Sequence, residues 1–155
     1  MNESSASISV KYQIVSPWFE MKYLPNYATS ESAGMDLHAC CSSDISFAPG
    51  QRQKVPTGLA IEMPNLEMVG LVFARSGLAW RHGLSLPNGV GVIDRDYTGE
   101  LQVLLQNFGE TSVVVKPGDR IAQLVFMPIY RAEWIQATAL RVTARGEGGF
   151  GSTGV

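Results

Sequence analysis

Asn88-Gly-Val-Gly-Val-Ile-Asp-Arg-Asp-Tyr-Thr-Gly-Glu-Leu101 combines a tight turn with reactive side chains at fixed offsets. The dipeptide Asn88-Gly89 is typical of a type I′ hairpin turn, and the apolar residues 90–93 that follow can form a strand. Polar side chains then crowd together beside a glycine, where backbone can approach a ligand closely: Asp94, Asp96 and Tyr97. The stretch predicts a hairpin with a chemically active tip, and a solvated acidic tip is the alternative.

Short apolar runs with a period of two lie on both sides of this hairpin. They are residues 8–14, 35–39, 59–63, 69–73, 101–105, 113–115 and 121–126. Turn signals separate them at Pro49-Gly50, Pro64-Asn65, Asn88-Gly89 and Pro117-Gly118. One brief helix is expected around residues 76–81. The pattern predicts an all-β fold, a distorted β-barrel or jelly roll of many short strands in a single domain.

Composition limits the partners and the compartment. A chain of 155 residues can bury a real core, and its formal net charge of −2 offers no basic face for nucleic acid or anionic lipid. The N-terminal residues lack a basic region and an apolar run, and no apolar stretch approaches the ~18 residues of a membrane span. Cys40 and Cys41 are adjacent, so they suit neither a disulfide nor a metal site. We expect a cytoplasmic protein without nucleic-acid or membrane partners.

The glycine-rich end of the chain differs from everything before it. Residues 145–155 contain five glycines, one aromatic side chain and no apolar period. Such a terminus is usually just mobile. The functional alternative is a flap whose backbone N–H groups wrap phosphate oxygens, with Arg145 adding charge and Phe150 stacking on a base. We therefore divide the chain into a β-barrel core, residues 1–144, and a flexible C-terminal arm, residues 145–155.

Five segments in order together resemble one family, the trimeric deoxyuridine triphosphate nucleotidohydrolases or dUTPases. The segments are Ala33-Gly-Met-Asp-Leu-His-Ala39, Ala74-Arg-Ser-Gly-Leu-Ala79, the Asn88–Leu101 stretch, Gly118-Asp-Arg-Ile-Ala-Gln-Leu124 and the Arg145–Gly154 arm. Any one of them is a weak match, but five at plausible spacing are highly specific. The resemblance implies a homotrimeric jelly roll that hydrolyses dUTP to dUMP and diphosphate with Mg²⁺. The reaction would supply dUMP for thymidylate synthesis and keep uracil out of DNA.

The resemblance also implies roles at the nucleoside. Asp94 is expected to be the general base for the water that attacks the α-phosphorus. Tyr97 is expected to lie against the deoxyribose, so that a 2′-hydroxyl collides with its ring. The groups expected to read uracil are the backbone at Val92, Ile93 and Asp94, the region of Gln102, and the Asn88 amide. Cytosine would leave such groups unpaired, which favours strong discrimination.

The triphosphate is expected to meet a second set of residues. Phosphate contacts are implied for Arg75, Ser76, Gly77, Gln123 and Arg145, with Phe150 and Gly151 of the arm also at the substrate. Mg²⁺ is expected to bind chiefly phosphate oxygens and water, with Asp36 touching a metal-bound water and no direct protein ligand. In the family the sites lie between subunits. One subunit gives the Asp36, Arg75–Ser76 and Gln123 segments, a second the hairpin, and a third the arm.

Other interpretations stay open from the sequence. A dCTP deaminase of the same fold would use a glutamate, and Glu100 lies close to a comparable position. A non-catalytic trimeric binding module is the alternative from another class. Arg75 could be a structural ion-pair partner rather than a phosphate contact. His38, His82, Cys40 and Cys41 receive no role, and neither rates nor regulatory partners follow from the sequence.

Overall fold

The structure, a computed structural model, describes residues 7–149 and confirms the all-β prediction. Its strands are β1 (Lys11–Ile14), β2 (Met35–His38), β3 (Ile45–Phe47), β4 (Arg52–Glu62), β5 (Met68–Ala74), β6 (Leu84–Ser85), β7 (Val90–Ile93), β8 (Glu100–Asn107), β9 (Val113–Val115) and β10 (Arg120–Pro128). The helices are a 3-10 turn, η1 (Met21–Tyr23), and α1 (Ser76–His82), which confirms the brief helix expected there.

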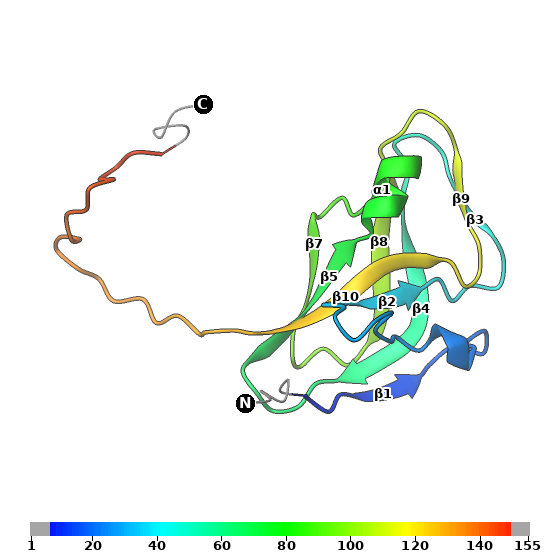
Figure 1. Ribbon diagram of the computed structural model, residues 1–155, viewed down its shortest axis with the longest axis horizontal. Helices are drawn as coiled ribbons and strands as arrows, with labels where there is room; N and C mark the ends of the chain where they lie inside the picture. Colours follow the sequence, from blue (N-terminus) through cyan, green and yellow to red (C-terminus); the bar gives the residue numbers. More distant parts are fainter. Residues whose placement is uncertain (1–6, 150–155) are drawn as a thin grey trace.

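Two four-stranded antiparallel sheets form the body of the molecule (Figure 1). Their strand orders are β1-β4-β8-β6 and β2-β10-β5-β7, and β3 pairs with β9 alongside them. The sheets share one core, to which β4 and β8 contribute Val55 and Leu105 while β2 and β10 contribute Leu37 and Ile121. Each such buried apolar side chain stabilises the fold by roughly 1.5–3 kcal/mol. This packing fixes where the ends of the strands lie, and the polar residues of interest are at those ends.

The hairpin expected at Asn88-Gly89 is wrong in its strand pairing. Gly89 has a φ of +71°, and its N–H donates to the Leu86 carbonyl at 3.2 Å, so the chain does turn here. However, β6 before the turn pairs with β8, whereas β7 after it pairs with β5. The turn therefore carries the chain from one sheet to the other, and residues 94–99 carry it back to β8. The residues of a turn predict where the chain changes direction, but they do not determine which strands pair with each other.

The sequence predicted only the second part of the long strand β4, residues 59–63, because Pro56 interrupts the first part. The pairing of β4 with β8 shifts register between Pro56 and Ala60, as a β-bulge does. Within the bulge Thr57 Oγ1 donates to the Leu101 carbonyl at 2.7 Å, and the Gly58 N–H donates to Glu100 Oε1 at 2.9 Å. These bonds hold the start of β8, and with it the end of the 94–99 loop, against β4.

The chain leaves the body after β10. Ile129 and Arg131 still contact Glu67 of the body, whereas residues 132–149 extend far from both sheets (Figure 1) and include almost fully exposed apolar side chains such as Trp134 and Leu140. Residues 129–144 were expected to belong to the core, and in this single chain residues 132–144 lie outside it. The division at residue 144 remains a prediction for the assembled protein. None of the helices within residues 7–149 is long and apolar enough to cross a membrane.

Candidate functional site

The loop after β7 holds its polar side chains through a small hydrogen-bonded turn. The Tyr97 N–H donates to the Asp94 carbonyl at 3.1 Å, and the Tyr97 hydroxyl donates to the Glu100 carbonyl at 2.8 Å. The ring consequently folds over Gly99, where an added Cβ would lie 2.7 Å from the Tyr97 hydroxyl oxygen. Only glycine leaves room for the ring in this place, so the sequence Tyr-Thr-Gly sets the position of Tyr97.

A cleft of about 270 Å³ opens between this loop and β8. Its lining residues are Lys54, Val92, Ile93, Asp94, Tyr97, Gln102 and Leu104. The cleft thus gathers most of the residues that were expected to contact a nucleoside. Asp94 is exposed there, and Gln102 Nε2 lies 3.4 Å from Glu100 Oε2. Asn88 is absent from the lining, because it precedes β7 at the strand's other end and donates to the Val90 carbonyl at 3.2 Å.

A second cluster forms where β2, β10 and β5 lie side by side. Gln123 of β10 is opposite Asp36 of β2 and Phe73 of β5, and Arg75 directly follows β5. Arg75 Nε lies 2.8 Å from Asp36 Oδ1, and Arg120 Nη1 lies 3.2 Å from Asp36 Oδ2. Gln123 Nε2 donates to the Ala74 carbonyl at 3.2 Å. One carboxylate therefore orients two guanidinium groups, and the cluster keeps a net positive charge that suits an anion.

The same edge carries two more residues that were expected to contact the phosphates. Ser76 and Gly77 open α1 and are exposed beside Arg75. Arg75 and Arg120 both line a cavity of about 790 Å³ between α1 and residues 109–115. The structural interpretation of Arg75 is thus observed, as the ion pair with Asp36. It does not exclude a phosphate contact, because a guanidinium has five N–H donors and this pair uses few of them.

His38 and the two cysteines show the effects of burial. His38 stacks on Tyr23 with ring centroids 5.8 Å apart, and its Nδ1 is buried without a hydrogen-bond partner in the described structure. Burial lowers the pKa of His38, and nearby Asp36 opposes this only in part. Burial also raises the pKa of the Cys41 thiol, while Cys40 is buried in the body. These groups are thus suited to packing rather than to nucleophilic chemistry.

The two clusters lie at opposite ends of one strand. β5 and β7 are antiparallel, with Gly70 opposite Ile93. Asp94 follows β7 beyond that end of β5, whereas Arg75 follows the other end of β5. Five residues along β5 span roughly 17 Å at ~3.3 Å per residue. That distance far exceeds the separation between neighbouring phosphate groups, so a single chain does not bring Asp94 and Arg75 into one site.

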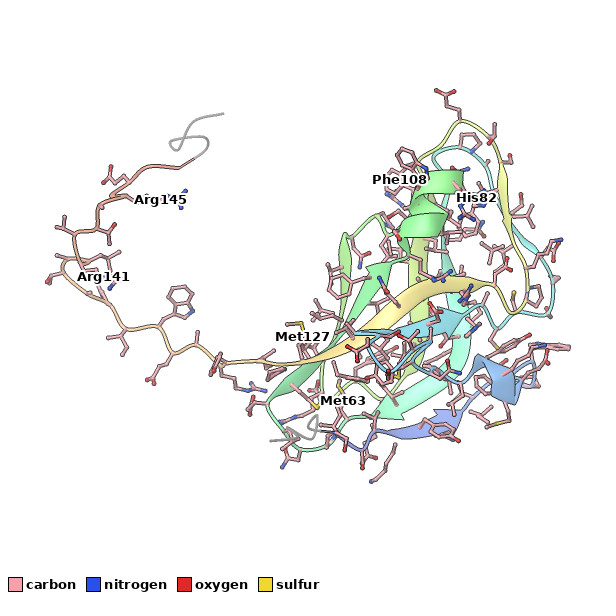
Figure 2. The ribbon with its side chains drawn as sticks, in the orientation of Figure 1. Met63, His82, Phe108, Met127, Arg141 and Arg145 are labelled. Carbon is pink, nitrogen blue, oxygen red and sulfur yellow. The ribbon has the colours of Figure 1, made fainter. Side chains whose placement is uncertain are left out.

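The arm places Arg145 away from both clusters (Figure 2). Arg145 Nε donates to the Gly148 carbonyl at 2.9 Å, and the Gly148 N–H donates to the Arg145 carbonyl at 3.0 Å. Arg145 is therefore held within a local turn of the arm. Phe150 and Gly151, which were also expected at the substrate, lie outside the described residues.

Several residues at the two clusters were not singled out by sequence reasoning. Arg120 pairs with Asp36, and Lys54 and Leu104 line the nucleoside-sized cleft. Arg120 falls inside the Gly118–Leu124 segment, two residues after its glycine, so that motif could have identified it. Lys54 and Leu104 carried no signal, because their position depends on the pairing of β4 with β8, in which Lys54 is opposite Leu104.

Comparison with known proteins shows consistent similarity to one family. The sequence profile of the dUTPase family matches residues 20–154. A deoxyuridine 5'-triphosphate nucleotidohydrolase from Desulfitobacterium hafniense is 55% identical over 132 residues, covering 85% of this chain and 87% of that protein. One from Salmonella typhi is 49% identical over 131 residues, covering 84% and 87%. Among solved structures, the Staphylococcus bacteriophage 80alpha dUTPase with dUPNHPP has a TM-score of 0.85 at 27% identity, covering 95% of this chain and 99% of that one.

Proposed function

This chain belongs to the dUTPase family and hydrolyses dUTP to dUMP and diphosphate, and we propose that Asp94 activates the attacking water. Asp94 is exposed at the cleft beside Tyr97, where a carboxylate can accept a proton from water bound against the α-phosphate. General-base assistance of this kind typically contributes ~10²–10⁴-fold. In the cytoplasm, the reaction would supply dUMP for thymidylate synthesis and keep uracil out of DNA.

The cleft between the 94–99 loop and β8 supports recognition of a deoxyuridine. The Tyr97 ring lies over Gly99, and we expect it to leave no room for a 2′-hydroxyl on a sugar that packs on it. Backbone groups of residues 92–94 and the Gln102 side chain face the same cleft and can pair with the uracil edge. Asn88 is also proposed to contact uracil, and its side chain would first have to give up its hydrogen bond to the Val90 carbonyl.

The Asp36 cluster supports binding of the phosphates. Arg75 is already oriented by Asp36, so it loses little side-chain entropy when a phosphate oxygen takes its free donors. Ser76, the Gly77 N–H and Gln123 lie along the same edge and add neutral donors. Arg145 of the arm would close over the γ-phosphate, with Phe150 and Gly151 following it. These contacts neutralise charge, which is the main contribution a protein makes to phosphoryl transfer.

Mg²⁺ fits these residues as an ion held by the substrate. Among residues 7–149 no group of three or more His, Cys, Asp or Glu side chains is placed to hold a metal ion. Asp36 accepts from two arginines, and a carboxylate has about four acceptor positions, so it can still bond a metal-bound water. The ion would supply Lewis-acid stabilisation of charge on the phosphates. The protein's own part is to orient that hydrated ion through Asp36.

The observation that carries the proposed assembly is the distance between the two clusters. Because Asp94 and Arg75 lie roughly 17 Å apart along β5 in one chain, a working site needs the Asp94 cleft of one subunit beside the Arg75 cluster of another. The arm, which extends away from its own body, is free to reach a further subunit. Both features favour a homotrimer with shared active sites, as the family resemblance implies.

Mixed trimers test this assembly. Arg75→Gln and Asp94→Asn chains, each inactive alone, are denatured and refolded together in equal amounts. If the two residues come from different subunits, each choice has a probability of one half, so about a quarter of the sites are complete. A site within one chain would recover no activity. Refolded single variants are the control, and an absence of activity in confirmed mixed trimers would refute the shared site.

The deaminase alternative is not favoured by the position of Glu100. Its Oε1 accepts the Gly58 N–H at 2.9 Å and its Oε2 lies 3.4 Å from Gln102 Nε2, so the carboxylate supports the β4 bulge. Incubation with dUTP, dCTP, dTTP and UTP distinguishes the candidates. We expect diphosphate from dUTP. Ammonia from dCTP would support a deaminase, and no product at all would support a binding module.

A further inference from the structure

The turn that carries Asp94 and Tyr97 is tied to a loop on the neighbouring strands. Arg95 is one of the two central residues of this turn. Its Nη1 donates to the Leu66 carbonyl at 3.3 Å and lies 3.8 Å from Glu67 Oε1. Leu66 and Glu67 belong to the connection between β4 and β5. The turn is thus anchored by the side chain between its two functional residues.

The same loop also holds the first residues after β10, from which the chain continues toward the arm. Arg131 Nε lies 3.0 Å from Glu67 Oε2, and the Ile129 N–H donates to the Glu67 carbonyl at 3.0 Å. Ile129 and Arg131 lie within the first three residues beyond β10, whose penultimate residue, Met127, is labelled in Figure 2. Together with Asp94 and Arg95, these residues line a cleft of about 300 Å³. One carboxylate therefore bridges the catalytic turn and the point where the arm departs.

We propose that Glu67 is a positioning residue for the hydrolysis reaction. Its two oxygens hold Arg95 and Arg131, so it fixes the turn that presents Asp94 and links that turn to the direction of the arm. This inference rests on the proposed role of Asp94. Without Glu67, the guanidinium groups of Arg95 and Arg131 lose the carboxylate that they share. Arg95 is then held by its hydrogen bond to the Leu66 carbonyl alone among its described contacts, so the turn that carries Asp94 is held less firmly.

The expected effect is modest, because the three side chains are partly exposed. Their exposed fractions are 32% for Arg95, 54% for Glu67 and 73% for Arg131. Each exposed ion pair of this kind stabilises a structure only slightly. Because the two pairs together position the catalytic base, we expect their loss to lower kcat about threefold to tenfold. High salt screens such pairs. The kcat of the native enzyme should therefore fall with added salt more than that of a chain without the bridge.

The test compares Glu67→Gln with a matched control. Glu62→Gln removes another exposed ion pair, Lys11–Glu62 at 2.7 Å, whose glutamate is 59% exposed, ends β4 and bonds neither Arg95 nor Arg131 among the described contacts. We expect Glu67→Gln to lower kcat about threefold to tenfold, to leave KM for dUTP within about twofold, and to lose most of the salt response of kcat. Glu62→Gln should leave all three unchanged. Equal kcat and equal salt response in both variants would overturn the proposal.

A second comparison isolates the bridge itself. Arg131→Gln should reproduce part of the loss, and the double variant Glu67→Gln, Arg131→Gln should lose no more than Glu67→Gln alone, because the partners act as a unit. Fully additive losses would overturn the link to the arm. Asp94→Asn separates this inference from the proposed function. If Asp94→Asn retains activity, the proposed role of Asp94 fails, whereas an inactive Asp94→Asn with an unaffected Glu67→Gln removes only the role of Glu67.

Discussion

Substitution of Gly99 by alanine tests how Tyr97 selects a deoxyribose. An added Cβ would lie 2.7 Å from the Tyr97 hydroxyl oxygen and 2.8 Å from Cζ, well inside van der Waals contact. The backbone at Gly99 is not in the left-handed region, so alanine adds no strain there and the tyrosine ring must move instead. The ring then loses the hydrogen bond to the Glu100 carbonyl.

The size of the effect follows from these contacts. Loss of one exposed hydrogen bond destabilises the fold by about 0.5–1.5 kcal/mol, and a Gly→Ala change returns about 0.4–1 kcal/mol through the unfolded chain. Stability should therefore change little. Specificity should change more, because relief of one steric contact is worth roughly 1–3 kcal/mol, or about tenfold to 200-fold. We expect the ratio of kcat/KM for dUTP over UTP to fall by at least about tenfold.

The assay measures diphosphate release from dUTP and UTP by both chains, with Tyr97→Phe as the control. Tyr97→Phe keeps the ring and removes only the hydroxyl, so its discrimination should stay within about threefold of the native value. This role of the Tyr97 ring is refuted if Gly99→Ala discriminates against UTP as well as the native enzyme does. It is also refuted if Tyr97→Phe loses as much discrimination as Gly99→Ala, because the hydroxyl rather than the ring position would then decide specificity.

Three further predictions concern the base, the arm and the buried histidine. Asp94→Asn should fold, bind dUTP and lose ~10²–10⁴-fold in kcat, and near-native turnover would remove Asp94 from the mechanism. Deletion of residues 145–155 should leave the melting temperature nearly unchanged and sharply reduce kcat, since the hydrogen bonds of Arg145 within residues 7–149 all lie in its own turn; unfolding would show that the segment is structural. Burial lowers the pKa of His38 in the folded chain. As pH falls below ~6.5, the unfolded chain therefore binds more protons at His38 than the folded chain does, and the folded chain becomes less stable. Melting curves between pH 7.5 and 5.5 should therefore shift less for His38→Phe, which keeps the stack on Tyr23, and equal shifts would exclude His38 as the source.

Local chemistry explains what the sequence could predict. Period-two runs located most of the strands, and the Arg-Ser-Gly segment was placed correctly at the start of the short helix α1. Asp94 and Tyr97 were grouped with Gln102, and the cleft between β7 and β8 does contain all three. These successes share a cause: each depends on side chains within a few residues of one another, or on a motif whose parts lie on neighbouring strands.

The errors and omissions depend on long-range pairing. The sequence offered no signal for the pairing of β6 with β8 and of β7 with β5, so a sheet-crossing turn was interpreted as a hairpin. Glu67 carried no motif either, and its importance comes from Arg95 and Arg131, which are 28 and 64 residues later in the chain. The separation of the two clusters along β5 was likewise not visible, because it is a property of strand register.

The exposed residues 132–144, which lead to the C-terminal arm, suggest how assembly and catalysis would be coupled. Trp134, Ile135, Leu140 and Val142 are 84–98% exposed in the single chain, although burial of each would stabilise it by roughly 1.5–3 kcal/mol. The proposed homotrimer offers a source of that free energy, because this segment extends away from its own body and could pack on another subunit. Contacts that bury these side chains would also carry Arg145, a few residues later, to its place beside the substrate. In the proposed homotrimer, ordering of the arm, subunit assembly and closure over the phosphates would be one linked equilibrium, so activity per chain is expected to fall on dilution below the trimer dissociation constant.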